Sequence, residues 1–101
     1  MLRMVKVSLL TGLLAVASVA ALADGTGGAI RESAAACRKH SANAASLDVR
    51  HMMRALCESY WRADIPEVRE SIACSYERAN AFYADKRPPK EALDGILRSC
   101  E

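Results

Sequence analysis

The chain has 101 residues, 51% of them apolar, and a formal net charge of +2. This length leaves room for one small domain and excludes two-domain enzymes, nucleotide-binding folds of ordinary size and barrels. No segment has the period-two alternation of a strand. We therefore expect an all-α protein, a small bundle of about four short helices.

Residues 1–23 are typical of a secretory signal peptide. Arg3 and Lys6 give it a positive start, residues 7–20 are mostly apolar, and Ala21-Leu22-Ala23 is a small-x-small cleavage site. The alternative is a retained membrane anchor, because the apolar run approaches the lower length limit of a spanning helix. Its Ala-rich composition and the small residues at its end favour cleavage.

Cleavage after residue 23 of 101 would leave 78 residues, which divide into a flexible leader, 24–28, and a single helical domain, 29–101. Two of the 14 Lys and Arg residues leave with the signal, whereas all 12 Asp and Glu residues remain, so the mature chain has no net formal charge. Such a chain lacks the positive field that phosphate-backbone binding requires, so we expect no nucleic-acid partner. We expect a periplasmic or secreted product that meets the membrane only through its signal peptide.

The first two helices are predicted from alanine content and from apolar spacing. Residues 29–42 form an Ala-rich helix whose narrow face of small residues includes Cys37 and Ser41. Ser46 is the predicted N-cap of a second helix that runs to Arg62. Its apolar side chains recur at i, i+3, i+4 and i+7, the clearest amphipathic pattern in the chain: Val49, Met52, Met53, Leu56, Cys57 and Tyr60.

Prolines mark the starts of the last two helices. Asp64 is the predicted cap of the third helix, with Glu67 as its capping-box partner and Pro66 in the first turn. This helix is expected to end at residues 85–87, and Pro88-Pro89 opens the fourth. The expected apolar stripes are Val68, Ile72, Tyr76, Ala79 and Tyr83 on the third helix, and Leu93, Ile96, Leu97 and Cys100 on the fourth.

Four cysteines, Cys37, Cys57, Cys74 and Cys100, all follow the signal. An even number of cysteines in so small an exported chain predicts two disulfides. Cys74 and Cys100 lie at nearly equal distances from the turn at Lys86, so two adjacent antiparallel helices would bring them within reach. This favours Cys74–Cys100 with Cys37–Cys57, and the alternative pairing is Cys57–Cys74 with Cys37–Cys100.

Metal binding is one alternative function. Cys37 and His40 are three residues apart on one helix, and His51 and Met52 offer further ligands for copper or zinc. However, Met52 lies on the apolar stripe whereas His51 projects from the opposite face, and exported cysteines are more often bridged than metallated. We therefore expect neither a bound metal nor another cofactor.

The residues typical of catalysis are sparse. The chain has two histidines and no Cys-x-x-Cys motif, and nothing in it suggests a nucleophile with a base and an orienting group. Charged residues at a spacing of four, such as Arg54 with Glu58 and Glu58 with Arg62, are typical of solvated ion pairs on a helix surface. We therefore expect a protein that is not an enzyme.

Arg50, Arg54 and Trp61 share one flank of the second helix, about a quarter turn from its apolar stripe. Tryptophan and arginine are enriched at interface hot spots, so this flank is the predicted partner-binding surface. The alternative is that Trp61 packs over a neighbouring helix, with the arginine stems covering it.

An exported, all-helical domain with four cysteines is similar in plan to some periplasmic immunity proteins that neutralise cell-wall-degrading effectors. The resemblance is one of architecture and assigns no residue. We expect a non-catalytic protein-binding module of inhibitor, immunity or adaptor type, whose partner is an exported enzyme or effector. A periplasmic copper- or zinc-binding protein and a secreted effector or toxin are the alternatives. A homodimer is also open, because so small a domain buries more surface by pairing.

Overall fold

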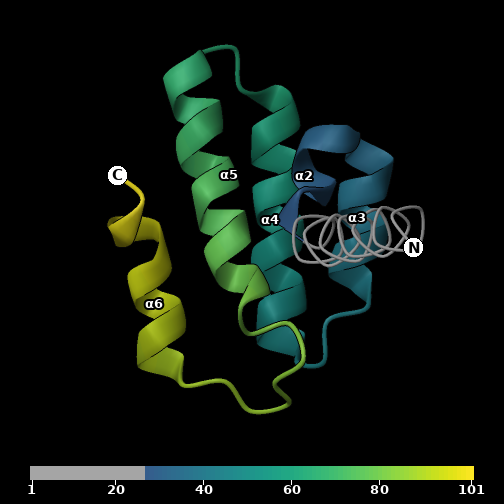
Figure 1. Cartoon of the computed structure of the whole chain (residues 1–101), viewed down its shortest axis with the longest axis vertical. Helices are drawn as coiled ribbons and strands as arrows, with labels where there is room; N and C mark the ends of the chain where they lie inside the picture. The colour runs from purple at the N-terminus through teal and green to yellow at the C-terminus, as the bar shows by residue number, and fades with distance from the viewer. Residues whose placement is uncertain (1–26) are drawn as a thin grey trace, which may run out of the picture.

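The computed structural model of the chain describes residues 27–101; the predicted signal peptide, 1–23, lies outside them. The prediction of an all-α protein is confirmed for this part of the chain, which contains no strand. Its helices are α2 (Ala29–Glu32), α3 (Ala34–Ala42), α4 (Leu47–Arg62), α5 (Pro66–Asn80) and α6 (Lys90–Ser99). Helix α4 packs against both α3 and α5, while α6 lies along α5 at the edge of the bundle (Figure 1).

The single helix predicted over 29–42 is wrong, because the chain is divided at Ser33. This residue has extended backbone angles, φ −169° and ψ 162°, and its Oγ accepts a hydrogen bond from the amide of Ala36 at 2.9 Å. Ser33 therefore acts as the N-cap of α3, and the alanines after it cannot extend the helix backwards. The break turns α2 across the bundle, so that Ile30 is completely buried.

The predicted helix from Ser46 to Arg62 is confirmed as α4. The Ser46 Oγ accepts from the amide of Val49 at 3.2 Å, which satisfies one free N–H of the first turn. Val49 and Met53 are completely buried, as their positions on the apolar stripe predict. Met52 is only partly buried, because it lies at the edge of that stripe.

The predicted cap of the third helix is wrong by one residue. Helix α5 has Pro66 at its first position, so Ile65 is the N-cap and makes no side-chain capping hydrogen bond. Proline suits the first helical position, and it holds the preceding residue in an extended conformation, here φ −93° and ψ 121°. Asp64 is therefore one residue too early to cap and is exposed, as is Glu67, its predicted capping-box partner.

The predicted end of the third helix at residues 85–87 is also wrong. Helix α5 ends at Asn80, and residues 81–84 form turns. The backbone carbonyl of Tyr83 accepts from the amide of Ala45 at 2.8 Å, and its hydroxyl donates to the carbonyl of His40 at 2.8 Å. These two contacts, one with the end of α3 and one with the turn that follows it, draw Tyr83 away from the path of α5.

The favoured disulfide pairing is confirmed, and the alternative pairing is wrong. Cys37–Cys57 joins α3 to α4 inside the core, where both residues are almost completely buried. Cys74–Cys100 joins α5 to the end of α6, and the Ser71 Oγ donates to the Cys100 carbonyl at 2.8 Å beside it. Two disulfides are typical of an oxidising, exported compartment.

The fourth helix begins after Pro88-Pro89 as predicted, but its apolar side is only partly covered. Leu93 and Ile96 are buried, whereas Leu97 is 53% exposed, contrary to the predicted stripe. Val68 on α5 is also more exposed than predicted, at 44%. Both differences arise because α6 packs mainly against α5 and leaves an open face beside α4.

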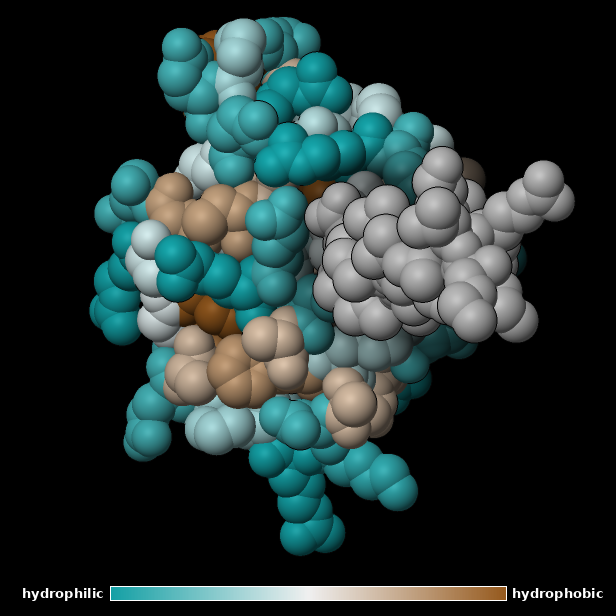
Figure 2. Space-filling model, viewed as in Figure 1, coloured by the Kyte–Doolittle hydropathy of each residue, from teal (hydrophilic) through white to brown (hydrophobic). Residues whose placement is uncertain are grey.

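Two further observations concern the ends and the surface of the described residues. Gly27, in the predicted leader, is buried so close to α5 that a Cβ there would lie 3.1 Å from Cγ of Glu77. No helix in residues 27–101 is long and apolar enough to cross a membrane. Figure 2 shows one face of the molecule, on which apolar side chains gather over α5 and α6 among hydrophilic ones.

Candidate functional site

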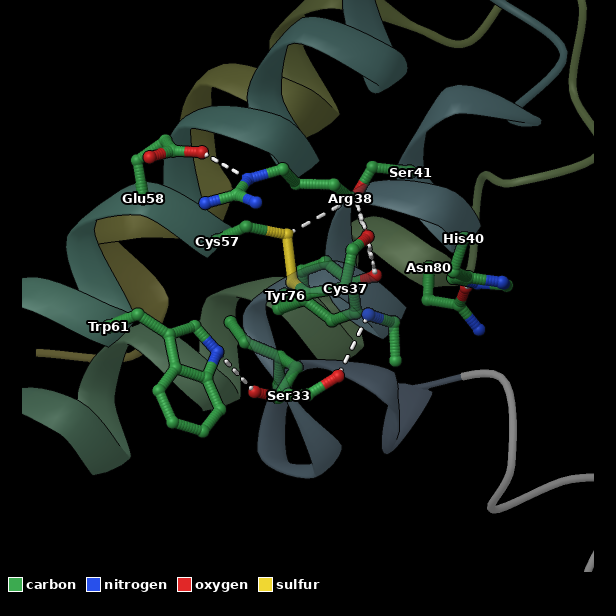
Figure 3. The surroundings of a disulfide bond; sticks show 12 residues. Ser33, Cys37, Arg38, His40, Ser41, Cys57, Glu58, Trp61, Tyr76 and Asn80 are labelled. Carbon is green, nitrogen blue, oxygen red and sulfur yellow. Dashed lines mark hydrogen bonds and ion pairs between the residues drawn. A yellow bond between two sulfur atoms is a disulfide. The ribbon is translucent and has the colours of Figure 1, made fainter.

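Trp61 lies at the end of α4 with one edge fixed and the rest partly in solvent. Its Nε1 donates to the backbone carbonyl of Ile30 at 3.0 Å (Figure 3). The indole also packs edge-on against Tyr60, with the ring centroids 5.4 Å apart. Only one edge of Trp61 therefore packs over a neighbouring helix, as the predicted alternative has it, while 40% of the residue remains exposed.

The cation that stacks on Trp61 is Arg69 of α5, which the sequence analysis did not select. Its guanidinium carbon lies 5.5 Å from the Trp61 ring and 4.6 Å from the Tyr60 ring, within the range of cation–π attraction. The Arg69 Nε is buried with no hydrogen-bond partner among the described residues. Trp61 and Arg69 are equally distant from Ile65. Equal distances from a turn place two residues at the same height on adjacent antiparallel helices, as for Cys74 and Cys100, so this spacing is the sequence signal that points to the pair.

The two predicted arginines of this flank have different surroundings. Arg50 is half-buried, and its Nε donates to the Ser46 carbonyl at 3.4 Å. Arg54 is exposed and lies two helical turns before Trp61, about 10 Å along the axis. The structure therefore places Arg50, Arg54 and Trp61 on one helix face but brings a fourth residue, Arg69, onto the aromatic rings.

The ion pairs near this flank join residues of different helices and not residues within α4. Glu58 Oε1 accepts from Nε of Arg38 at 2.8 Å, so the predicted partners Arg54 and Arg62 are wrong for Glu58 (Figure 3). This hydrogen bond and the charge of Arg38 lower the pKa of the Glu58 carboxyl. Arg31 of α2 pairs with Glu70 at 2.6 Å, and the hydrogen bond raises the pKa of the Arg31 guanidinium.

The residues of the metal alternative do not form one site. Cys37 is held in a disulfide and offers no thiolate. His40 Nε2 lies 2.7 Å from Asn80 Oδ1, and its ring stacks on that of Tyr83 with the centroids 4.2 Å apart. His51 is exposed, and no group of three or more His, Cys, Asp and Glu residues within 27–101 could hold a metal ion.

A buried hydroxyl network surrounds the Cys37–Cys57 disulfide. The Ser41 Oγ donates to the carbonyl of Cys37 at 2.7 Å and lies 3.3 Å from both the Cys57 Sγ and the Tyr76 hydroxyl (Figure 3). The Tyr76 hydroxyl also donates to the Cys37 carbonyl at 3.3 Å. Tyr76 is completely buried, and this burial raises the pKa of its phenol, although the contact with the Ser41 hydroxyl opposes the shift.

This pKa shift predicts a loss of stability at alkaline pH. The neutral phenol is favoured in the folded state, so its contribution is complete below the pKa of an unfolded tyrosine, about 10, and is lost as the pH rises through the higher folded value. Tyr83, whose pKa is also raised by burial, contributes in the same direction. Urea unfolding measured between about pH 9 and 11 should show this decline, and it should be shallower in Tyr76→Phe. An equal decline in both proteins would contradict it.

An apolar groove lies between α4, α5 and α6, on a face that the sequence analysis did not single out. Its volume is about 790 Å³, and among residues 27–101 the only charged residue that lines it is Arg62. Apolar and small residues make up most of the remainder: Met52, Ala55, Leu56, Ser59, Ala63, Val68, Ile72 and Leu97. Because Val68 and Leu97 are half-exposed, the groove is open to solvent along one side.

Comparison of this chain with protein-family models, with curated proteins and with solved structures finds no match.

Proposed function

We propose that this protein is an exported, non-catalytic binding module of inhibitor, immunity or adaptor type, and that it binds its partner protein through the flank around Trp61. The observation that supports this proposal is the state of Trp61 itself, which is 40% exposed although its Nε1 is fixed on the Ile30 carbonyl. An aromatic side chain that is ordered before binding loses little conformational entropy when a partner covers it.

Positive charge beside Trp61 defines the chemistry of the partner. Arg54 is exposed on the same face of α4, and Arg69 stacks on the indole from α5. Within residues 27–101, neither arginine takes part in an ion pair. The proposed partner therefore presents acidic side chains next to an apolar pocket for the indole. The proposed partner is an exported enzyme or effector, which the protein would bind in the periplasm or the extracellular space.

The test begins with the protein exported by its native host from the full chain. A photo-cross-linking amino acid at position 54 should capture one defined protein, whereas the same residue at the exposed position 98 on α6 should not. The captured protein is then purified, and its affinity for the unlabelled module is measured directly.

The affinity measurement decides the proposal. Arg54→Glu should weaken binding about tenfold or more, because it places a like charge against the acidic partner. Its melting temperature should remain that of the wild type, since Arg54 is exposed. The matched control, Arg98→Glu, should leave affinity unchanged. Equal affinities for wild type and Arg54→Glu would overturn the proposal for this flank.

A further inference from the structure

The open face of α4 carries a regular sequence of side chains. Asp48, Met52, Ala55, Ser59 and Arg62 follow one another at spacings of four, three, four and three, which places them on a single face of the helix. Met52 is half-buried and the other four are exposed. From the first turn to the last, this face is acidic, then apolar and small, and finally basic. All of its members except Asp48 line the apolar groove.

This face is complementary to itself when two copies run antiparallel. Ala55 is its midpoint, with Asp48 seven residues before it and Arg62 seven after, about 10 Å away in each direction. A two-fold axis through Ala55 would therefore place Asp48 of each copy opposite Arg62 of the other. The small side chain of Ala55 allows the two helices to approach closely at the axis.

We propose that a second copy of this chain occupies the groove, with the two α4 helices packed antiparallel about a two-fold axis at Ala55. The charges support this occupant, because neither Asp48 nor Arg62 forms an ion pair within residues 27–101. The α4 helix of each copy would also cover apolar side chains that the other copy leaves exposed. Leu97 and Val68, 53% and 44% exposed, flank the groove that receives the partner's α4.

A small-molecule ligand fits the groove less well. Its volume of about 790 Å³ lies in the range of ligand pockets, but such pockets bury most of the ligand surface. Here two large apolar side chains of the lining are half in water, so a small ligand would remain exposed on that side. A helix ridge covers an open groove of this kind, with anchors at i, i+3, i+4 and i+7.

The pairing is independent of the proposed partner-binding flank. On α4, Arg54 and Trp61 are rotated by about 100–160° from Ala55 and Ser59, at about 100° per residue. A dimer of this form therefore leaves both copies of Trp61 accessible. If partner binding failed its test, the proposed dimer would still stand. If the protein were monomeric, the proposed partner-binding flank would still stand.

Charge reversal tests the arrangement directly. The protein, exported from its full chain, is studied by sedimentation equilibrium over a wide concentration range, and the wild type is expected to dimerise. Asp48→Arg and Arg62→Asp each place two like-charged pairs at the interface, so each should weaken dimerisation about tenfold or more. The double variant restores both pairs with reversed sign and should recover the dimer.

Two further variants separate the interface from general effects. Leu97→Gln should weaken dimerisation without loss of helicity, because Leu97 is already half-exposed. Lys39→Glu, an exposed charge reversal on α3 away from the groove, should leave dimerisation unchanged. The proposal is overturned if the wild type is monomeric at every concentration. This holds also if native mass spectrometry detects a small molecule bound to that monomer. It is equally overturned if the single reversals have no effect or if the double variant fails to dimerise.

Discussion

Replacement of Cys37 and Cys57 together by alanine should lower the free energy of unfolding by more than about 3 kcal/mol, which is the chain-entropy value for a closed loop of this size. The two cysteines are 20 residues apart and at most 1% exposed, so the variant also loses packing in the core. A domain of this size has a total stability of roughly 4–12 kcal/mol. Urea unfolding followed by circular dichroism measures the loss.

The second disulfide provides the matched control. Cys74 and Cys100 close a longer loop, 26 residues apart, so chain entropy alone gives them a slightly larger effect. Both are only partly buried, however, and they attach α6 at the edge of the bundle. We therefore expect the loss of Cys37–Cys57 to be the larger of the two. A smaller loss for Cys37–Cys57 than for Cys74–Cys100 would contradict the central role assigned to the buried bridge.

Tyr76→Ala should lower the free energy of unfolding by about 4 kcal/mol, the usual cost of truncating a buried aromatic residue. Tyr76 is among the largest completely buried side chains, and it lies against Ser41 and the Cys37–Cys57 disulfide. The alanine variant would leave a cavity at the point where α3, α4 and α5 meet. Thermal and urea unfolding monitored by circular dichroism give the value.

Tyr76→Phe separates the ring from its hydroxyl. The Ser41 Oγ still donates to the Cys37 carbonyl in this variant, so no buried donor is left without a partner. The loss should therefore be about 1 kcal/mol, the value of one ordinary hydrogen bond. A phenylalanine variant as unstable as the alanine variant would show that the hydroxyl network, and not the ring, supports the core.

Local chemistry determined most of the secondary structure from the sequence. Ser46 caps α4 with its own hydroxyl, and Pro88-Pro89 sets the start of α6 because a proline is tolerated at a helix start and keeps the residue before it out of the helix. The pairing of Cys74 with Cys100 was favoured by helix rise and by position relative to one turn. Each of these predictions depends on a few neighbouring residues or on simple helix geometry, and each is confirmed.

The candidate site was only partly accessible to such reasoning. Trp61 was identified from its residue type and helix face, but its contacts with Ile30 and Arg69 come from two other helices. Arg50 and Arg54 share its face, whereas the cation on the ring is Arg69. Contacts between helices depend on crossing angles and levels, which a periodic pattern within one helix does not contain.

The sequence by itself determined the helical class and the helix starts at Ser46 and Pro88-Pro89, because local hydrogen bonds and helix periodicity control them. It favoured one disulfide pairing over another, and the tertiary structure decided between the two. The tertiary structure alone decided where α5 ends, since contacts of Tyr83 with α3 outweigh the continuing helical pattern. It also decided that Leu97 and Val68 remain exposed. Helix α6 is attached to α5 by Cys74–Cys100 and does not cover α4, so an apolar pattern that predicts burial instead forms the wall of an open groove.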